Sequence, residues 1–224
     1  MTRNQFLIAL VGVAVVILGV AAWFVFFGSG TGSDDAVADT PAYKFTITPY
    51  DRTMGSPNAP LTVIEYAAPS CPFCAHFFSD VFPQFKSGWI DTGKAYFVFR
   101  VLPINAVDVA AESMARCLPA NRYFHFIDLL YRNQDKWDPD GHEIPDVHGA
   151  LLQMGAMESM NAAKADACIK DQAQGKRTIA LAQAASKQYG IDRTPTVFAN
   201  GHFVNDVDTY DKFNTALTAV AASR

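Results

Sequence analysis

The stretch "VIEYAAPSCPFC" (residues 63–74) decides the fold, because it joins an apolar strand to a helix through two closely spaced cysteines. The wider segment "APLTVIEYAA" (59–68) is β-branched and nearly all apolar, which predicts a strand buried on both faces. A helix is expected to follow, with Ser70 as its cap and Pro72 tolerated in its first turn. The cysteines therefore stand at the carboxyl end of a strand, where an α/β sheet presents its reactive groups.

Cys71 and Cys74 have the spacing of a redox pair. In the first turn of a helix, positions three apart share one face, so the two sulfurs can meet. Cys71 would lie at the helix N-terminus, where unpaired N–H groups and the positive end of the helix dipole stabilise a thiolate. This predicts Cys71 as an exposed nucleophile of low pKa and Cys74 as the more buried thiol that resolves the mixed disulfide.

The same pair could instead bind a metal or serve as a structural bridge. A zinc or copper site needs further ligands, and Cys117 and Cys168 lack the spacing of a second ligand pair. His76 is a candidate ligand, but on a helix it would point away from Cys71. A structural bridge would close too short a loop to stabilise much. We therefore expect redox chemistry, without a metal or a cofactor.

Glu65 lies in the most apolar strand, six residues before Cys71. Carboxylates are seldom fully buried without a partner, and a buried one near a dithiol would have a raised pKa. Glu65 could then take the proton from Cys74 as that thiol attacks the mixed disulfide. The alternative is a glutamate at the end of the strand that faces solvent.

The rest of the chain predicts one more buried strand, "KAYFVFRVLPI" (94–104), and a hairpin, "TPTVFANGHFV" (194–204), that turns at Asn200-Gly201. Pro83 should kink or break the first helix near Val81. Gly190 is expected to end the helix that precedes the hairpin. The other predicted helical segments span residues 106–118, 120–137, 144–171, 172–189 and 211–222, with Gly155 and Gly175 as weak points.

Together with "YGIDRTPTVFANG" (189–201), the opening stretch resembles the DsbA-like thiol:disulfide oxidoreductases of the thioredoxin superfamily, and more narrowly their membrane-anchored bacterial extracytoplasmic branch. The resemblance covers roughly residues 43–222. It implies an α/β thioredoxin fold with a helical insertion at about 104–189, which compact thioredoxins lack.

The resemblance also assigns residues to the substrate site. It implies a cis peptide bond between Thr194 and Pro195 that faces the Cys71 sulfur. Cis bonds are essentially a proline feature and mark tight turns. In the family this loop leaves backbone groups free to pair with a substrate strand. Thr194, Pro195, Pro72 and Phe73 are accordingly the expected substrate-binding residues.

Cys117 and Cys168 both fall in the predicted helical insertion. In an exported protein an even number of cysteines usually pairs. A bridge would close a loop of about 52 residues, worth on the order of 4 kcal/mol in the chain-entropy model. The resemblance allows an additional disulfide in the helical domain. Two buried free thiols are the alternative.

Residues 6–27 run 22 positions without a charge. A helix of that length reaches about 33 Å, enough to cross the core of a bilayer. Arg3 precedes the run and acidic residues follow it, which favours a cytoplasmic tail of residues 1–5 and export of the rest. Residues 28–42 are small, polar and acidic, typical of a flexible linker to the domain at 43–222.

A cleaved signal peptide is the alternative to a membrane anchor. "AVA" at residues 36–38 is a passable cleavage triplet, but it lies ten residues beyond an apolar run that is long for a signal peptide. Either interpretation places the folded domain in the periplasm or on the outer face of the cell membrane, an oxidising compartment.

The direction of electron flow depends on Phe73. Strongly oxidising members of the family carry a histidine between the cysteines, and Phe73 offers neither an N–H group nor a charge. The Cys71 thiolate should therefore be less stabilised and the protein a milder oxidant. The leading hypothesis is a disulfide donor to newly exported polypeptides that a quinone-linked membrane partner reoxidises.

Two other functions remain open. One is an isomerase or reductase kept reduced by a membrane electron donor, for example in cytochrome c maturation. Isomerases usually need a dimerisation domain, and residues 28–42 are too short for one, so we expect a monomer. The other is a redox-inactive binding or chaperone module, against which two intact cysteines argue. The net charge of -4 and the lack of a basic run exclude nucleic acid as an expected partner.

Overall fold

The computed structural model describes residues 42–223. The predicted cytoplasmic tail at 1–5, the membrane segment at 6–27 and nearly all of the linker at 28–42 lie outside this range. Within it, no helix combines the length and the apolar character needed to cross a bilayer.

A five-stranded sheet forms the centre of the domain, in the spatial order β1-β3-β2-β4-β5. β2 and β3 are parallel, and the other neighbouring strands are antiparallel. The sequence does not predict the edge strand β1, because a strand of three residues carries too little periodicity to be recognised. The strands are β1 (Arg52–Met54), β2 (Leu61–Ala67), β3 (Ala95–Val101), β4 (Thr196–Ala199) and β5 (His202–Val204).

The predicted hairpin is confirmed. Asn200 and Gly201 join β4 to β5 with φ angles of 47° and 87°, which is the backbone that a two-residue hairpin turn requires. A Cβ atom at Gly201 would lie 2.1 Å from the carbonyl oxygen of Tyr43, so only glycine fits. Gly190, with a φ of 67°, ends the preceding helix as expected.

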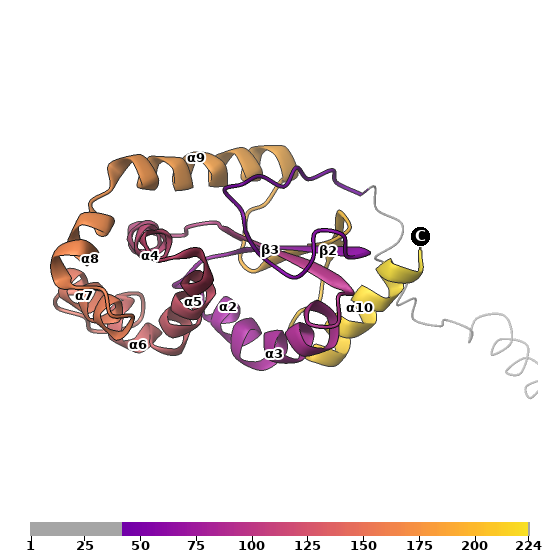
Figure 1. Cartoon of the computed structure of the whole chain (residues 1–224), viewed down its shortest axis with the longest axis horizontal. Helices are drawn as coiled ribbons and strands as arrows, with labels where there is room; N and C mark the ends of the chain where they lie inside the picture. The colour runs from indigo at the N-terminus through magenta and orange to yellow at the C-terminus, as the bar shows by residue number, and fades with distance from the viewer. Residues whose placement is uncertain (1–41, 224) are drawn as a thin grey trace, which may run out of the picture. The chain divides into compact units, whose positions relative to one another are not determined.

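Alternation along β2 divides its side chains between two apolar layers. Ile64 and Tyr66 pack in the layer under α9 (Gln172–Tyr189). Val63 and Ala67 pack in the layer that contains α2 (Pro72–His76), and Glu65, by alternation, points to that same side. Figure 1 shows the sheet between α9 on one side and α2, α3 (Phe82–Phe85) and α10 (Tyr210–Ala222) on the other.

Of the kink or break predicted near Val81, the break does not occur, because the helical path from α2 continues through Pro83. Residues Phe77–Val81 form a wider π-helical turn, in which the N–H of Phe82 donates to the carbonyl of Phe77, five residues back. α3 begins at Phe82, so Pro83 occupies its first turn, where a missing N–H group costs little. A second π-helical turn, Lys86–Ile90, follows α3.

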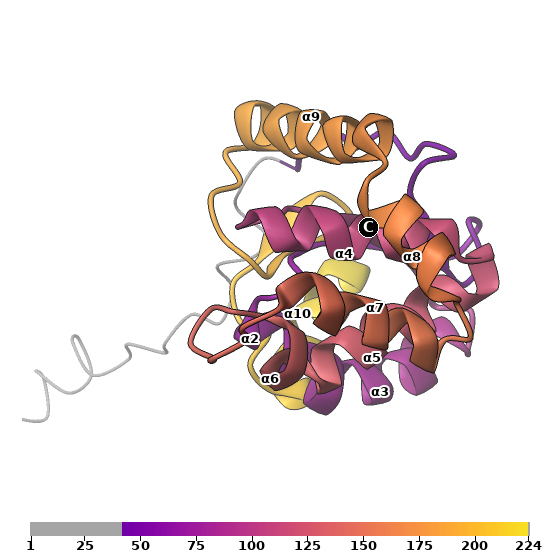
Figure 2. The same ribbon diagram turned by 90° about the vertical axis from the view of Figure 1, so that its left-hand side faces the viewer.

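The helical insertion lies between β3 and β4, as the resemblance implies, and Figure 2 views it from its own side. The helix predicted at 144–171 is two helices, because Ser159 adopts a φ of 60° and Asn161 caps a new helix. The insertion contains α4 (Ala106–Cys117), a 3-10 turn (Ala120–Arg122), α5 (Tyr123–Arg132), α6 (Gln134–Trp137), α7 (Val147–Met157), α8 (Ala162–Ile169) and α9.

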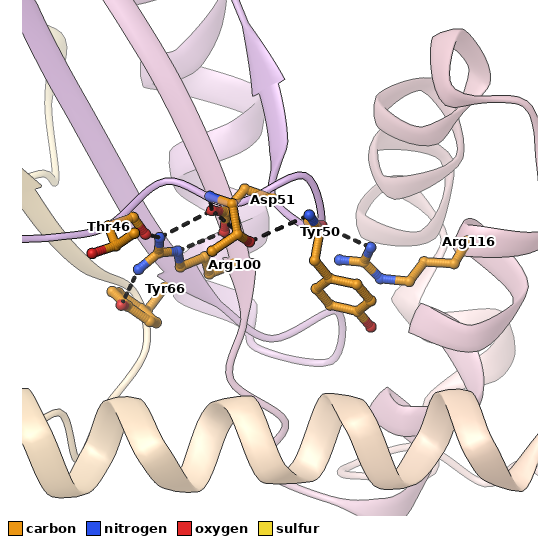
Figure 3. A network of polar contacts seen from close by, with 7 residues as sticks. Thr46, Tyr50, Asp51, Tyr66, Arg100 and Arg116 are labelled. Atoms are coloured by element: carbon orange, nitrogen blue, oxygen red, sulfur yellow. Dashed lines mark hydrogen bonds and ion pairs between the residues drawn. The ribbon is translucent and has the colours of Figure 1, made fainter.

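Two arginines fasten the N-terminal segment, residues 42–51, to the rest of the domain (Figure 3). Arg100 of β3 donates to both carboxylate oxygens of Asp51, at 2.7 and 3.1 Å, and to the hydroxyl of Tyr66. Arg116 of α4 donates to the carbonyl of Tyr50 at 2.9 Å. The segment therefore ties the sheet to the helical insertion on the face that α9 covers.

Candidate redox site

Cys71 caps the helix that follows β2. Its backbone is extended, and its sulfur accepts a hydrogen bond from the N–H of Cys74 at 3.3 Å. The prediction that Ser70 caps this helix is therefore wrong. The same sulfur lies 3.3 Å from the carbonyl oxygen of Thr194, to which the thiol can donate.

These contacts change the acidity of the two thiols in opposite directions. Hydrogen bonding with Cys74 is the largest influence and, with help from the side chain of Thr194 and against the effect of burial, lowers the pKa of Cys71 to about 6. Burial raises the pKa of Cys74 well above its ordinary value. The pair thus combines a thiol that ionises near neutrality with one that stays protonated, as the sequence predicts.

Cys71 is not the exposed residue that the sequence predicts. Only 3% of its surface is accessible, because the loop that carries Thr194 packs over the sulfur. The exposed part of the motif is Pro72, the first residue of α2, and Phe73, which is 69% accessible. A partner would therefore meet the Phe73 ring before it reaches the Cys71 sulfur.

The peptide bond between Thr194 and Pro195 is cis. The two residues are half-buried and directly precede β4, and the hydroxyl of Thr196 donates to the carbonyl of Arg193 at 2.7 Å within the same loop. The structure thus brings the expected substrate-binding loop and the two cysteines together, although more than a hundred residues separate them in the sequence.

Glu65 is fully buried between Phe99 of β3 and Val197 of β4 in the sheet register. Neither carboxylate oxygen has a hydrogen-bond partner. Burial first, and the negative charge of Cys71 second, raise the pKa of Glu65 well above its ordinary value. A glutamate facing solvent is therefore excluded, and the raised pKa favours the protonated form of this buried carboxyl group.

Tyr131 of α5 is a member of this buried group that sequence reasoning missed. Its hydroxyl is buried without a partner, and its ring lies 5.2 Å from that of Phe78. Burial, and then the charges of Cys74 and Glu65, raise its pKa well above the ordinary value. In the sequence Tyr131 belongs to an aromatic helix typical of a core, so no local signal marks it.

Cys117 and Cys168 form a disulfide that joins the end of α4 to the end of α8, with 6.1 Å between their Cα atoms.

The ring nitrogens of His76 do not contact Cys71 or Cys74. Nε2 lies 2.9 Å from the carbonyl oxygen of Asp208, and Nδ1 lies 2.9 Å from a carboxylate oxygen of Asp80. Residues 42–223 contain no cluster of three histidine, cysteine or acidic side chains that could hold a metal ion.

The sheet, the position of the cysteine pair and the helical insertion define a thioredoxin-like protein. The sequence matches the family described as Thioredoxin over residues 47–219, so the chain belongs to that family. Among solved structures, it superposes on α-DsbA1 of Wolbachia pipientis with a TM-score of 0.72 and 24% identity, over 80% of this chain and 94% of that one. BdbD of Bacillus subtilis gives a TM-score of 0.63 at 19% identity, over 82% and 100% of the two chains.

Two relatives show how far the sequence similarity extends. A Rickettsia bellii protein, named as a candidate protein-disulfide oxidoreductase, is 29% identical over 158 residues, or 70% of this chain and 60% of that protein. Disulfide bond formation protein D of Bacillus subtilis is 24% identical over 197 residues, or 82% and 81% of the two chains. The chain thus spans about 60% of the length of the Rickettsia relative it matches.

Proposed function

We propose that this protein is an extracytoplasmic protein-disulfide oxidoreductase that donates the Cys71–Cys74 disulfide to exported polypeptides. The observation that carries the proposal is the contrast between the two thiols: Cys71, held at the N-terminus of α2, has a pKa of about 6, whereas burial keeps Cys74 protonated. The names of the relatives from Rickettsia bellii and Bacillus subtilis point to the same chemistry.

The exchange proceeds in two steps. A substrate thiolate attacks the Cys71 sulfur of the oxidised pair, forms a mixed disulfide and displaces Cys74, which leaves with the electron pair and takes up a proton. A second substrate thiolate then attacks the substrate sulfur and releases Cys71 as a thiolate. The substrate loses two electrons and the protein gains them. A thiol of low pKa leaves readily, so the acidity of Cys71 favours this direction.

Glu65 supplies and receives the proton of Cys74 in this scheme. Its carboxyl group is buried on the side of the sheet where Cys74 lies, and burial raises its pKa, which favours the protonated form. It can protonate Cys74 as that sulfur is displaced and take the proton back when Cys74 attacks in the reverse reaction. Glu65→Gln should slow the step in which Cys74 attacks the mixed disulfide, measured by rapid quench. An unchanged rate would exclude the proton transfer.

The four residues around the sulfur form the proposed substrate site. Thr194 and Pro195 offer the backbone of the loop before β4, and Pro72 and Phe73 form the exposed surface beside Cys71. An extended substrate segment would pair with that loop and place its cysteine against Cys71. Recognition through backbone groups suits a protein that acts on many sequences.

Export is supported by the Cys117–Cys168 disulfide, because such bonds persist in oxidising compartments. We propose that residues 6–27 anchor the domain in the membrane, that residues 28–42 tether it, and that a membrane redox partner reoxidises Cys71 and Cys74. The domain is proposed to act as a monomer.

The redox state of Cys71 in the cell tests the function. Trapping of free thiols in acid, followed by electrophoresis, should find the pair mostly as a disulfide, and the purified oxidised protein should refold a reduced substrate that contains several cysteines. A pair that is mostly reduced would instead establish a reductase or isomerase. A protein that neither reduces insulin nor oxidises dithiols would be a binding module, and Cys71→Ser provides the inactive control.

A further inference from the structure

Asp108, in the first turn of α4, forms hydrogen bonds with the backbone beside the nucleophile Cys71. It is fully buried, and its Oδ1 accepts a hydrogen bond from the N–H of Ser70 at 2.7 Å. Its Oδ2 accepts from the N–H of Ile104 at 2.9 Å. Asn105 completes the contact, because its side chain caps α4 at the N–H of Asp108 and donates to the hydroxyl of Ser70 at 3.0 Å. The N–H and the hydroxyl of Ser70 are thus both bonded to side chains of the helical insertion.

Gln134 holds the same loop from a second helix, α6. Its Nε2 donates to the carbonyl of Pro69 at 2.9 Å and to the carbonyl of Cys71 at 3.1 Å. The carbonyl of Cys71 also accepts the N–H of Ala75 at 3.0 Å, which is part of the first turn of α2. Gln134 therefore contacts the two peptide groups that set the direction in which α2 starts.

All three side chains come from the insertion, whereas the loop they hold belongs to the thioredoxin core. Figure 1 shows α2 beside α5, and Figure 2 shows α6 close to α2. We infer that Asp108 and Gln134 are positioning residues for the disulfide exchange proposed above, and that they hold the Pro69–Cys71 loop so that the Cys71 sulfur stays at the N-terminus of α2.

The physical reason lies in the geometry of one hydrogen bond. The sulfur of Cys71 accepts the N–H of Cys74 at 3.3 Å, and because a hydrogen bond weakens steeply as its angle departs from linearity, a rotation of the loop would weaken it. The Gln134→Ala variant removes two neutral donors and changes no charge. Asp108→Asn keeps the size of the side chain but replaces one accepting oxygen by an NH₂ group. That group is itself a donor and cannot accept the N–H that the oxygen held. Either change should free the loop.

The test is the pKa of Cys71, read from the ultraviolet absorbance of its thiolate in protein with only the Cys71–Cys74 pair reduced. We expect Gln134→Ala and Asp108→Asn to raise it by about half a unit to one unit, the worth of one weakened hydrogen bond to an ionised group. Loss of a negative charge at Asp108 would by itself lower this pKa. A rise in the Asp108→Asn variant therefore identifies positioning rather than charge.

Glu112→Gln is the matched control. Glu112 is also a buried carboxylate of α4, but it bonds to Arg116 and to the hydroxyl of Tyr123, away from the loop. Its variant should lose stability and leave the Cys71 pKa unchanged. An unchanged or lowered pKa in Gln134→Ala overturns the inference, as does an equal rise in Glu112→Gln. Because Gln134 is only half-buried, its variant decides the matter if Asp108→Asn does not fold.

Failure of the inference and failure of the proposed function give different results. If wild-type protein exchanges disulfides with substrates but the pKa of Cys71 is the same in both variants as in wild type, only the positioning role is lost. If the variants shift the pKa but wild-type protein exchanges no disulfide, the proposed function is lost and the role in exchange falls with it.

Discussion

The sulfur of Cys71 lies 3.3 Å from the carbonyl oxygen of Thr194, although 123 residues separate the two in the sequence. The N–H of Cys74 holds the sulfur from the other side at the same distance. The nucleophile is therefore fixed between the N-terminus of α2 and the loop that leads to β4. Its ionisation depends on groups from two distant parts of the chain, and this dependence can be measured.

Reduction of the Cys71–Cys74 pair should stabilise the fold more as the pH rises. The pKa of Cys71 is about 6 in the folded protein, against an ordinary value of 9.0. The unfolded chain thus binds more protons than the folded one between these two values, so the stability of the reduced form increases with pH across that window and is lost as the pH falls through 6. Urea unfolding of both redox forms from pH 5 to 9 gives the difference.

The difference between the redox forms removes most of the contribution of Glu65, because burial, the larger cause of its raised pKa, acts in both forms. A protein with Cys71→Ser, which cannot ionise at this position, should show no such rise. A difference that is flat between pH 6 and 9 would mean that the folded protein does not stabilise the thiolate.

Glu65→Gln should stabilise the protein at neutral pH. The folded state keeps Glu65 protonated above its ordinary pKa of 4.5, so stability falls as the pH rises from that value toward the raised pKa. Each pH unit costs about 1.4 kcal/mol, which allows a gain on the order of 1–3 kcal/mol at pH 7 once the carboxyl group is removed. Urea midpoints at pH 4 and pH 7 measure it, and the gain should shrink at the lower pH.

Glu112→Gln should have the opposite effect at pH 7. Glu112 is equally buried, but it has partners in Arg116 and Tyr123, so its replacement leaves a buried guanidinium without its carboxylate. Two buried glutamates would then respond to the same substitution with opposite signs. A loss of stability in both variants would show that Glu65 has a partner after all.

Local signals account for what the sequence predicts well. The apolar run of β2, the Asn200-Gly201 turn and the stop at Gly190 each depend on the backbone preferences of neighbouring residues, and each appears in the structure. The resemblance supplies the rest of the architecture, because the spacing of "CPFC" and "TPT" fixes which parts of the chain face each other.

What the sequence does not predict depends on contacts between distant elements. No local sequence signal distinguishes Tyr131 from a core aromatic residue, or Asp108 and Gln134 from ordinary helix residues. Their roles depend on the packing of α4, α5 and α6 against the region around Cys71. The burial of Cys71 has the same origin, because the covering loop arrives from Thr194. The helix continues through Pro83 because a π-helical turn precedes it, and no residue type in the sequence predicts such a turn.

Removal of the second disulfide should destabilise the oxidised protein substantially. Cys117 and Cys168 are 51 residues apart in the sequence, and a bridge over a loop of that length restricts the unfolded chain by about 4 kcal/mol in the chain-entropy model. Replacement of both by alanine, followed by urea unfolding, measures the loss. A change below about 1 kcal/mol would show that native strain or residual structure in the unfolded chain offsets the restraint.

Phe73→His should make the protein a stronger oxidant. Phe73 is 69% accessible, so the substitution does not disturb the core. An imidazole beside Cys71 adds an N–H group and, when protonated, a positive charge, both of which favour the thiolate. We expect the pKa of Cys71 to fall by about one unit and the equilibrium with glutathione to shift about tenfold toward the reduced protein.

The neutral variant Phe73→Gln separates the effect of the imidazole from the loss of the phenyl ring. Because hydrogen bonding with Cys74 already brings the pKa of Cys71 to about 6, the glutamine variant should stay near that value and near the wild-type equilibrium constant. If histidine and glutamine shift the equilibrium equally, then the aromatic ring, and not the missing charge, sets the redox poise. Equal constants for all three proteins would mean that the helix terminus alone determines how strongly this pair oxidises its substrates.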